Sequence, residues 1–171
     1  MIYAESDAIM CMQRHIAAND HDDGGTVMTS NFVFLQENWP DLYEIDNAAE
    51  GYLYADPNAC VFKIGFLAER LVQIILAYEE LESPQEATHL DRIRILRKEG
   101  LLPQNVDDIL FAIRKARNNA VHFGGSEQST AAVLLRMCHS LCGWFTEVYG
   151  SPEMEIPAYS EPEDLSRDQF Y

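Results

Sequence analysis

The chain holds 171 residues, with 28 acidic and 12 basic side chains and a net charge of −16. Because non-specific affinity for nucleic acid comes mostly from Lys and Arg on phosphate, this balance argues against a general polyanion binder, although it is compatible with a local basic patch. No apolar run approaches the ~18 residues of a membrane span, and no basic region precedes the first apolar stretch as it does in a signal peptide. These features predict a cytoplasmic protein with no membrane partner and a size suited to one domain.

Charge divides the chain into three segments. Residues 1–30 carry five acids and one Arg and end in a polar, Gly-containing stretch, which predicts a poorly ordered extension. Residues 151–171 carry six acids, one Arg and three prolines, which is typical of a tail or linker. The segment between them, 31–150, holds 17 acids and 10 bases and is the expected folded domain.

Apolar residues recur at helical spacing throughout this middle segment. The pattern predicts helices over 42–53, 57–78, 90–96, 106–123 and 132–148. No segment alternates in the manner of a strand with hairpin turns. We therefore predict an all-α fold, a bundle of four main helices with short additional helices and flexible acidic termini.

Several residues mark the expected helix ends. Asp56-Pro57 is a cap followed by a first-turn proline, Gly100 and Gly124-Gly125 follow helices as C-terminal glycines do, and Ser126 or Ser129 can cap the last helix. The residues expected in the core are Leu67, Leu71, Ile75, Ile109, Ile113, Leu135 and Trp144.

Common catalytic and metal motifs are absent from the sequence. It contains no phosphate-binding loop, no dinucleotide-binding glycine pattern and no His-Glu-x-x-His motif. Cys138 and Cys142 share a helix face, but His139 lies ~100° away around the helix, and two ligands do not make a zinc site. We therefore expect reduced, buried thiols, with no metal and no cofactor.

The most informative segment is basic. Seven of the twelve basic residues lie within 92–117, so this end of the molecule is locally positive. On a helix, three polar residues follow one another at intervals of four and lie on one face: Arg114, Asn118 and His122. The expected contacts to a nucleic acid or protein partner are Arg114, Lys115 and Arg117.

Arg117, Asn118 and His122 together suit metal-free RNA cleavage. The imidazole can move a proton near neutrality, the guanidinium can hold a phosphate, and Asn118 can orient the ring. Arg117 lies ~140° from His122 around an ideal helix, so the two meet at one phosphate only if the helix loosens near Phe123 or a second subunit supplies one of them. A structural interpretation stays open, since a His in the last helical turn stabilises the carbonyl end and arginines beside acids are usually ion-paired.

The segment Arg117-Asn118-Asn119-Ala120-Val121-His122 resembles the Arg-polar-x-x-x-His signature of the HEPN superfamily. Members are helical domains common in prokaryotic defence, and some are metal-independent ribonucleases that act as dimers, with the Arg and His of both subunits lining one cleft. The resemblance implies that Arg117, Asn118 and His122 are catalytic and that the active form is a homodimer.

A longer resemblance, to the N-terminal HEPN-like domain of type I restriction enzyme R subunits, runs in order across about 31–149. It rests on Asn31-Phe32-Val33-Phe34-Leu35, Ala48-Ala49-Glu50, Asp56 to Lys63, Leu101-Leu102-Pro103, Asn118 to His122, and Trp144-Phe145. In those subunits the domain precedes a nuclease and an ATP-driven DNA-translocating motor, and the motifs of both are missing here. The family often carries Gly where Arg117 stands and its Arg at the position of Arg114, so Arg117 brings this sequence closer to the ribonuclease signature.

Two hypotheses follow from this resemblance. The first is a truncated or stand-alone relative from a defence locus, a non-enzymatic module that docks through its 114–122 face on another restriction-modification subunit or on RNA or DNA. The alternative is a metal-independent ribonuclease using Arg117, Asn118 and His122. A ribonuclease needs Arg117 and His122 exposed in one cleft, whereas a docking module needs neither.

Overall fold

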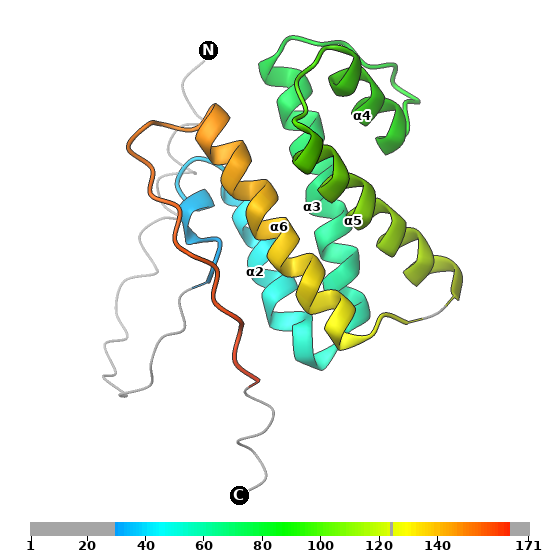
Figure 1. The fold of residues 1–171 in the computed structure, drawn as a ribbon, viewed down its shortest axis with the longest axis vertical. Coiled ribbons are helices and arrows are strands. Elements are labelled where there is room, and N and C mark those ends of the chain that lie inside the picture. Colours follow the sequence, from blue (N-terminus) through cyan, green and yellow to red (C-terminus); the bar gives the residue numbers. More distant parts are fainter. Residues whose placement is uncertain (1–29, 124, 165–171) are drawn as a thin grey trace, which may run out of the picture.

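The computed structural model describes residues 30–123 and 125–164, and within these ranges the chain forms five α-helices, one 3-10 turn and no strand (Figure 1). The predicted all-α fold is confirmed. The elements in chain order are η1 (Val33–Leu35), α2 (Pro40–Ala55), α3 (Pro57–Tyr78), α4 (His89–Lys98), α5 (Gln104–Phe123) and α6 (Gln128–Tyr149). The predicted N-terminal extension lies outside the described residues except for Ser30.

A local capping signal sets the beginning of α3 but not that of α6. Asp56 caps α3 by accepting a hydrogen bond from the backbone N–H of Ala59 at 3.0 Å, and Pro57 opens the helix, as predicted. The predicted serine cap of α6 is wrong, because Glu127 occupies the N-cap position and its side chain makes no capping hydrogen bond. The helix then begins at Gln128 without a side-chain cap.

The short helix α4 has well-defined ends. The Thr88 hydroxyl accepts from the backbone N–H of Asp91, and the Asp91 carboxylate accepts in return from the backbone N–H of Thr88, which together form a capping box. At the other end, Gly100 has a φ of 71°, a left-handed conformation that glycine adopts at low cost. These two signals position the basic α4 over one end of the bundle (Figure 1).

The core is built around α3, which packs against α2, α4, α5 and α6. Ten of its 22 residues are buried, because apolar residues recur around most of its circumference. Five of the predicted core residues are buried: Leu67, Leu71, Ile75, Ile113 and Leu135. The other two, Ile109 and Trp144, are half-buried and pack against the edge of the core. Among the described residues, no helix is long and apolar enough to cross a membrane.

The two ends of the described chain lie against each other and against α2 (Figure 1). The Asn31 amide donates to the Ser160 carbonyl at 2.8 Å, and the Ser160 backbone N–H donates to Asn31 Oδ1 at 2.7 Å. The Tyr54 hydroxyl on α2 donates to the Pro162 carbonyl at 2.7 Å. The segment 151–164 thus has no helix or strand, as expected of a tail, but it packs along the body rather than extending away from it.

Candidate functional site

Arg117 points from α5 into the contact with α3. Its guanidinium donates a hydrogen bond to the Glu69 carboxylate on α3 and forms an ion pair with it, and the two side chains are 32% and 28% exposed. One turn earlier on α3, Gly65 lets the arginine side chain pass close to the helix backbone. A Cβ atom at position 65 would lie 3.1 Å from Arg117 Cγ and closer still to Cδ. Arg117 is therefore held within the fold, with a carboxylate partner that offsets its charge.

The other predicted contact residues lie on the outer side of α5. The Arg114 guanidinium sits over the Phe111 ring, 5.8 Å from its centroid, and the Phe111 side chain is 55% exposed. Lys115 and Asn118 are exposed. Positions 111, 115 and 118 follow one another at intervals of four and three, so they face the same way. We call Phe111, Arg114, Lys115 and Asn118 the α5 stripe.

The cations of the basic segment differ in their ion pairing, and Arg92 and Lys98 form no ion pair with a described residue. Arg94 pairs with Asp91 at 3.2 Å and Arg97 with Asp107 at 2.7 Å, so part of the local positive charge is offset within the fold. Neither cation of the stripe forms an ion pair with any residue that the structure describes. The stripe is therefore a free cationic surface on an acidic chain.

His122 is the remaining predicted catalytic residue. It lies in the last turn of α5, which runs as one helix to Phe123, and its side chain is outside the described part of the structure. The backbone thus keeps Arg114, Asn118 and His122 in the predicted register. It places Arg117 on the side facing α3 and Asn118 on the exposed side, so the structure separates these two predicted partners.

A second histidine, His89, lies near the Arg117–Glu69 pair and was not predicted from the sequence. It is the first residue of α4, and both of its ring nitrogens are buried without a hydrogen-bond partner among the described residues. Burial lowers the pKa of His89 from its ordinary value of 6.5 to about 4, while the charges of Glu69 and Arg117 act in opposite directions. The imidazole is therefore neutral at neutral pH. No motif or spacing in the sequence indicates this position.

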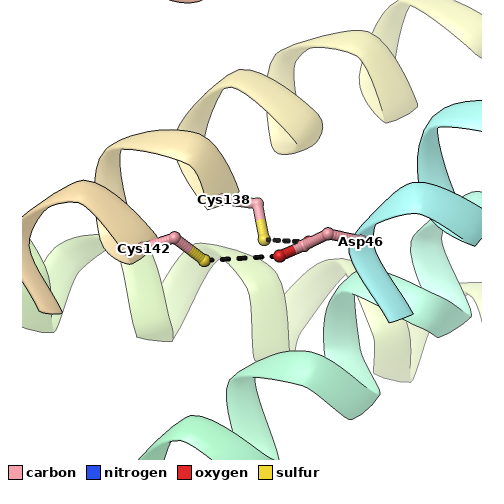
Figure 2. Close-up of side chains that lie close together, drawn as sticks. All are labelled: Asp46, Cys138 and Cys142. Carbon is pink, nitrogen blue, oxygen red and sulfur yellow. Dashed lines mark hydrogen bonds between the residues drawn. The ribbon is translucent and has the colours of Figure 1, made fainter. Parts of the chain in front are cut away.

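The interior holds a cluster of one carboxyl and two thiols (Figure 2). Asp46 of α2 is fully buried, and it accepts hydrogen bonds from the thiols of Cys138 at 3.4 Å and Cys142 at 3.5 Å, both on α6. Burial raises the pKa of Asp46 well above its usual value, against the opposing effect of the two thiols. Burial also raises the pKa of Cys142 to about 12. Burial thus favours the protonated form of the carboxyl and of the Cys142 thiol.

The helical spacing predicted that Cys138 and Cys142 lie on one face, but it did not predict that Asp46 lies beside them. The signal was present in α2, where the buried residues Leu42, Asp46, Ala49 and Leu53 follow one another at helical spacing. An aspartate on the apolar side of an amphipathic helix needs a buried partner. The sequence cannot supply that partner, because the cysteines lie 92 and 96 residues further along.

Taken together, these features define a small all-helical domain with a cationic, aromatic stripe on one helix and a thiol–carboxylate cluster in its core. Residues 47–167 match a known family, described as a domain of unknown function (DUF4145), and the chain belongs to this family. No solved structure matches the chain.

The chain is also similar to part of a much longer protein. The endonuclease subunit of the type I restriction enzyme EcoKI from Escherichia coli strain K12 is 28% identical to it over 138 residues. The similarity covers 78% of this chain and 11% of that subunit, so the chain spans about a tenth of the length of the relative. This partial similarity confirms the predicted relationship to a domain of a type I restriction enzyme subunit.

Proposed function

We propose that this domain is a non-catalytic, HEPN-like docking module of a cytoplasmic prokaryotic defence system, and that the α5 stripe binds another protein subunit of that system. The observation that carries the proposal is the surface of the stripe, where an exposed aromatic ring lies beside two cations that form no ion pair with the part of the chain that the structure describes. The similarity to a segment of a restriction enzyme subunit supports a partner within such an assembly.

The composition of the stripe favours a protein partner. Arg and aromatic side chains are enriched in the cores of protein interfaces and contribute a large share of their binding energy. The Phe111 ring offers apolar area, and Arg114 over it offers charge at a fixed position. Because the chain as a whole carries −16, it repels phosphate backbones over most of its surface, and the stripe is best suited to a small acidic patch on a partner.

The pairing of Arg117 supports a role in structure rather than catalysis. To hold a phosphate, its guanidinium has to leave Glu69 and expose a carboxylate that repels the same phosphate. Such a site loses the transition-state stabilisation that a free arginine provides. A homodimer that completes a cleft is an alternative outcome, which the light scattering below detects as a doubled mass of the chain alone.

The docking proposal is tested by co-expressing the tagged chain with the other subunits of a type I restriction enzyme from the same source. Complex formation is followed by size-exclusion chromatography with light scattering. The triple variant Phe111→Ala/Arg114→Ala/Lys115→Ala should elute alone. The control Phe62→Ala/Arg94→Ala/Lys98→Ala removes an exposed aromatic ring and two cations from α3 and α4, and it should elute with the complex. A stripe variant that still joins the complex would contradict the proposal.

The ribonuclease alternative is tested on the same protein. Wild type, Arg117→Ala and His122→Ala are incubated with RNA in excess EDTA, and the products are separated on a gel. Cleavage that survives chelation and disappears in both variants favours the ribonuclease. Absence of cleavage in all three proteins favours the docking module.

A further inference from the structure

We propose that Asp46, Cys138 and Cys142 are ligands of a buried, structural Zn²⁺ ion, with Cys60 turning toward them as the fourth ligand. The site would join α2, α3 and α6 at the centre of the bundle. It lies apart from the α5 stripe and does not depend on the docking proposal.

The geometry already brings three ligand atoms together. One carboxylate oxygen of Asp46 and the Sγ atoms of Cys138 and Cys142 lie within 4.8 Å of one another. The Sγ atom of Cys138 lies 3.4 Å from Asp46 Oδ1, and the Sγ atom of Cys142 lies 3.5 Å from Oδ2. Around tetrahedral zinc, bonds of ~2.3 Å to sulfur and ~2.0 Å to oxygen place a sulfur and an oxygen ~3.5 Å apart, so an ion would need the carboxylate to turn one oxygen toward both sulfurs.

The register of α6 provides the pair of thiols. Cys138 and Cys142 are four residues apart, so their side chains lie one above the other on one face of the helix. Figure 2 shows both sulfur atoms turned toward the Asp46 carboxyl across the gap between α6 and α2. All three residues are buried, so water does not compete for these positions.

The chemistry of the cluster favours a cation. A buried carboxyl normally needs strong donors or a positive partner, and here its donors in the described structure are two thiols, which are weak. A zinc ion would replace these weak hydrogen bonds with direct bonds to the carboxylate and to the deprotonated thiols.

The donor set selects among cations. Thiolates bind zinc well and discriminate against Mg²⁺ and Ca²⁺, which require oxygen ligands. With three thiolates and one carboxylate, the site has the same net charge as an all-cysteine zinc site. A closed set of four protein ligands leaves no open position for substrate, so the ion would act on stability rather than catalysis.

Cys60 would supply the fourth ligand. It is a buried free thiol on α3, and it is not among the three ligand atoms that lie within 4.8 Å of one another, so its side chain would have to turn toward them. Because each thiol must lose its proton to bind, zinc affinity should rise steeply with pH.

The test measures metal content and metal spectra under reducing conditions. The purified full chain is stripped with a chelator, reloaded with Zn²⁺ in competition with a chromophoric chelator, and separately loaded with Co²⁺. We expect one zinc per chain and a cobalt spectrum with thiolate charge-transfer bands and the intense visible bands of a tetrahedral ion. Absence of stoichiometric zinc, or a cobalt spectrum without thiolate bands, would overturn the proposal.

Matched variants assign the ligands. Because losing an outer partner of a metal ligand already costs roughly 10–100-fold, loss of a ligand in Cys138→Ser or Asp46→Asn should weaken zinc binding at least ~100-fold. Cys11→Ser removes the one cysteine outside the described residues and should bind like wild type. Unchanged affinity in both ligand variants would refute the site, and unchanged cobalt bands in Cys60→Ser would refute the role of Cys60.

A stability measurement guards against variants that fold poorly. Zinc should raise the thermal unfolding temperature of the stripped wild-type chain and leave that of Cys138→Ser unchanged, since an ion that binds the folded state stabilises it. An equal shift in the two proteins would show that zinc binds elsewhere and would contradict the assignment.

Discussion

Replacing Gly65 with alanine tests the internal position of Arg117. In the structure, the added Cβ atom would lie 3.1 and 3.2 Å from Arg117 Cγ and Cβ, and closer still to Cδ. The methyl group can be accommodated only if the arginine moves away from α3. That movement also breaks or weakens the ion pair with Glu69.

The magnitude follows from two opposing effects. Overpacking at a filled site costs ~1–3 kcal/mol, to which the loss of a partly exposed ion pair adds at most ~1 kcal/mol. Alanine in place of a helical glycine contributes about 1 kcal/mol of stability. Gly65→Ala alone should therefore lower the free energy of unfolding by roughly 0–3 kcal/mol. In an Arg117→Ala background the contacts to Cγ and Cδ are gone and only the 3.2 Å contact to Cβ remains, so the same substitution should raise the free energy of unfolding by up to ~1 kcal/mol.

The assay is a double-mutant cycle. Wild type, Gly65→Ala, Arg117→Ala and the double variant are unfolded in urea and followed by far-ultraviolet circular dichroism, and the coupling energy should be about 1–3 kcal/mol. A helical site elsewhere in the chain, Gly51→Ala in α2, has no atom within 4 Å of its added Cβ and should be stabilising in both backgrounds. A coupling below ~0.5 kcal/mol between positions 65 and 117 would refute the packing of Arg117 against α3.

Three further predictions concern stability. Leu71 is fully buried at the centre of α3, so Leu71→Ala should cost about 2–5 kcal/mol in urea unfolding, and a loss below ~1 kcal/mol would contradict its position in the core. His89 has a pKa of about 4 against an ordinary value of 6.5, so the unfolded chain binds more protons between these values, and stability should fall as pH is lowered through this range. His89→Gln should flatten that part of the pH profile, and an unchanged slope would exclude His89 as its source. Asp46 has a raised pKa, so in chelator its contribution to stability is lost as pH rises; the unfolding temperature of wild type should therefore fall more steeply with rising pH than that of Asp46→Asn, and equal slopes would contradict the raised pKa.

The helices could be predicted because their signals are local. The spacing of apolar residues is set by the helical period itself, and Asp56-Pro57 and Gly100 act within one turn of the helix ends that they define. The cap of α6 was mispredicted because serine is favoured at an N-cap by residue type, whereas the connection from α5 decides where the helix begins.

The side-chain partners could not be predicted, because they depend on how helices far apart in the sequence pack together. Arg117 and Glu69 are 48 residues apart, and nothing in the sequence around either one indicates that the other faces it. The helical spacing correctly predicts that Arg117 and Asn118 point in different directions, but it does not show which of the two side chains is buried. Asp46 could have been recognised as a buried polar residue, whereas its cysteine partners follow only from the packing of α2 on α6.

The central claim, that the α5 stripe is a docking surface, is tested most directly by the affinity of the purified complex in isothermal titration calorimetry. Two interface residues that each contribute ~2 kcal/mol correspond to a loss of several hundredfold, so Phe111→Ala/Arg114→Ala/Lys115→Ala should bind at least ~100-fold more weakly than wild type. The matched control Phe62→Ala/Arg94→Ala/Lys98→Ala should stay within about threefold, since surface residues outside an interface contribute little. Equal affinities of the two triple variants would contradict the claim.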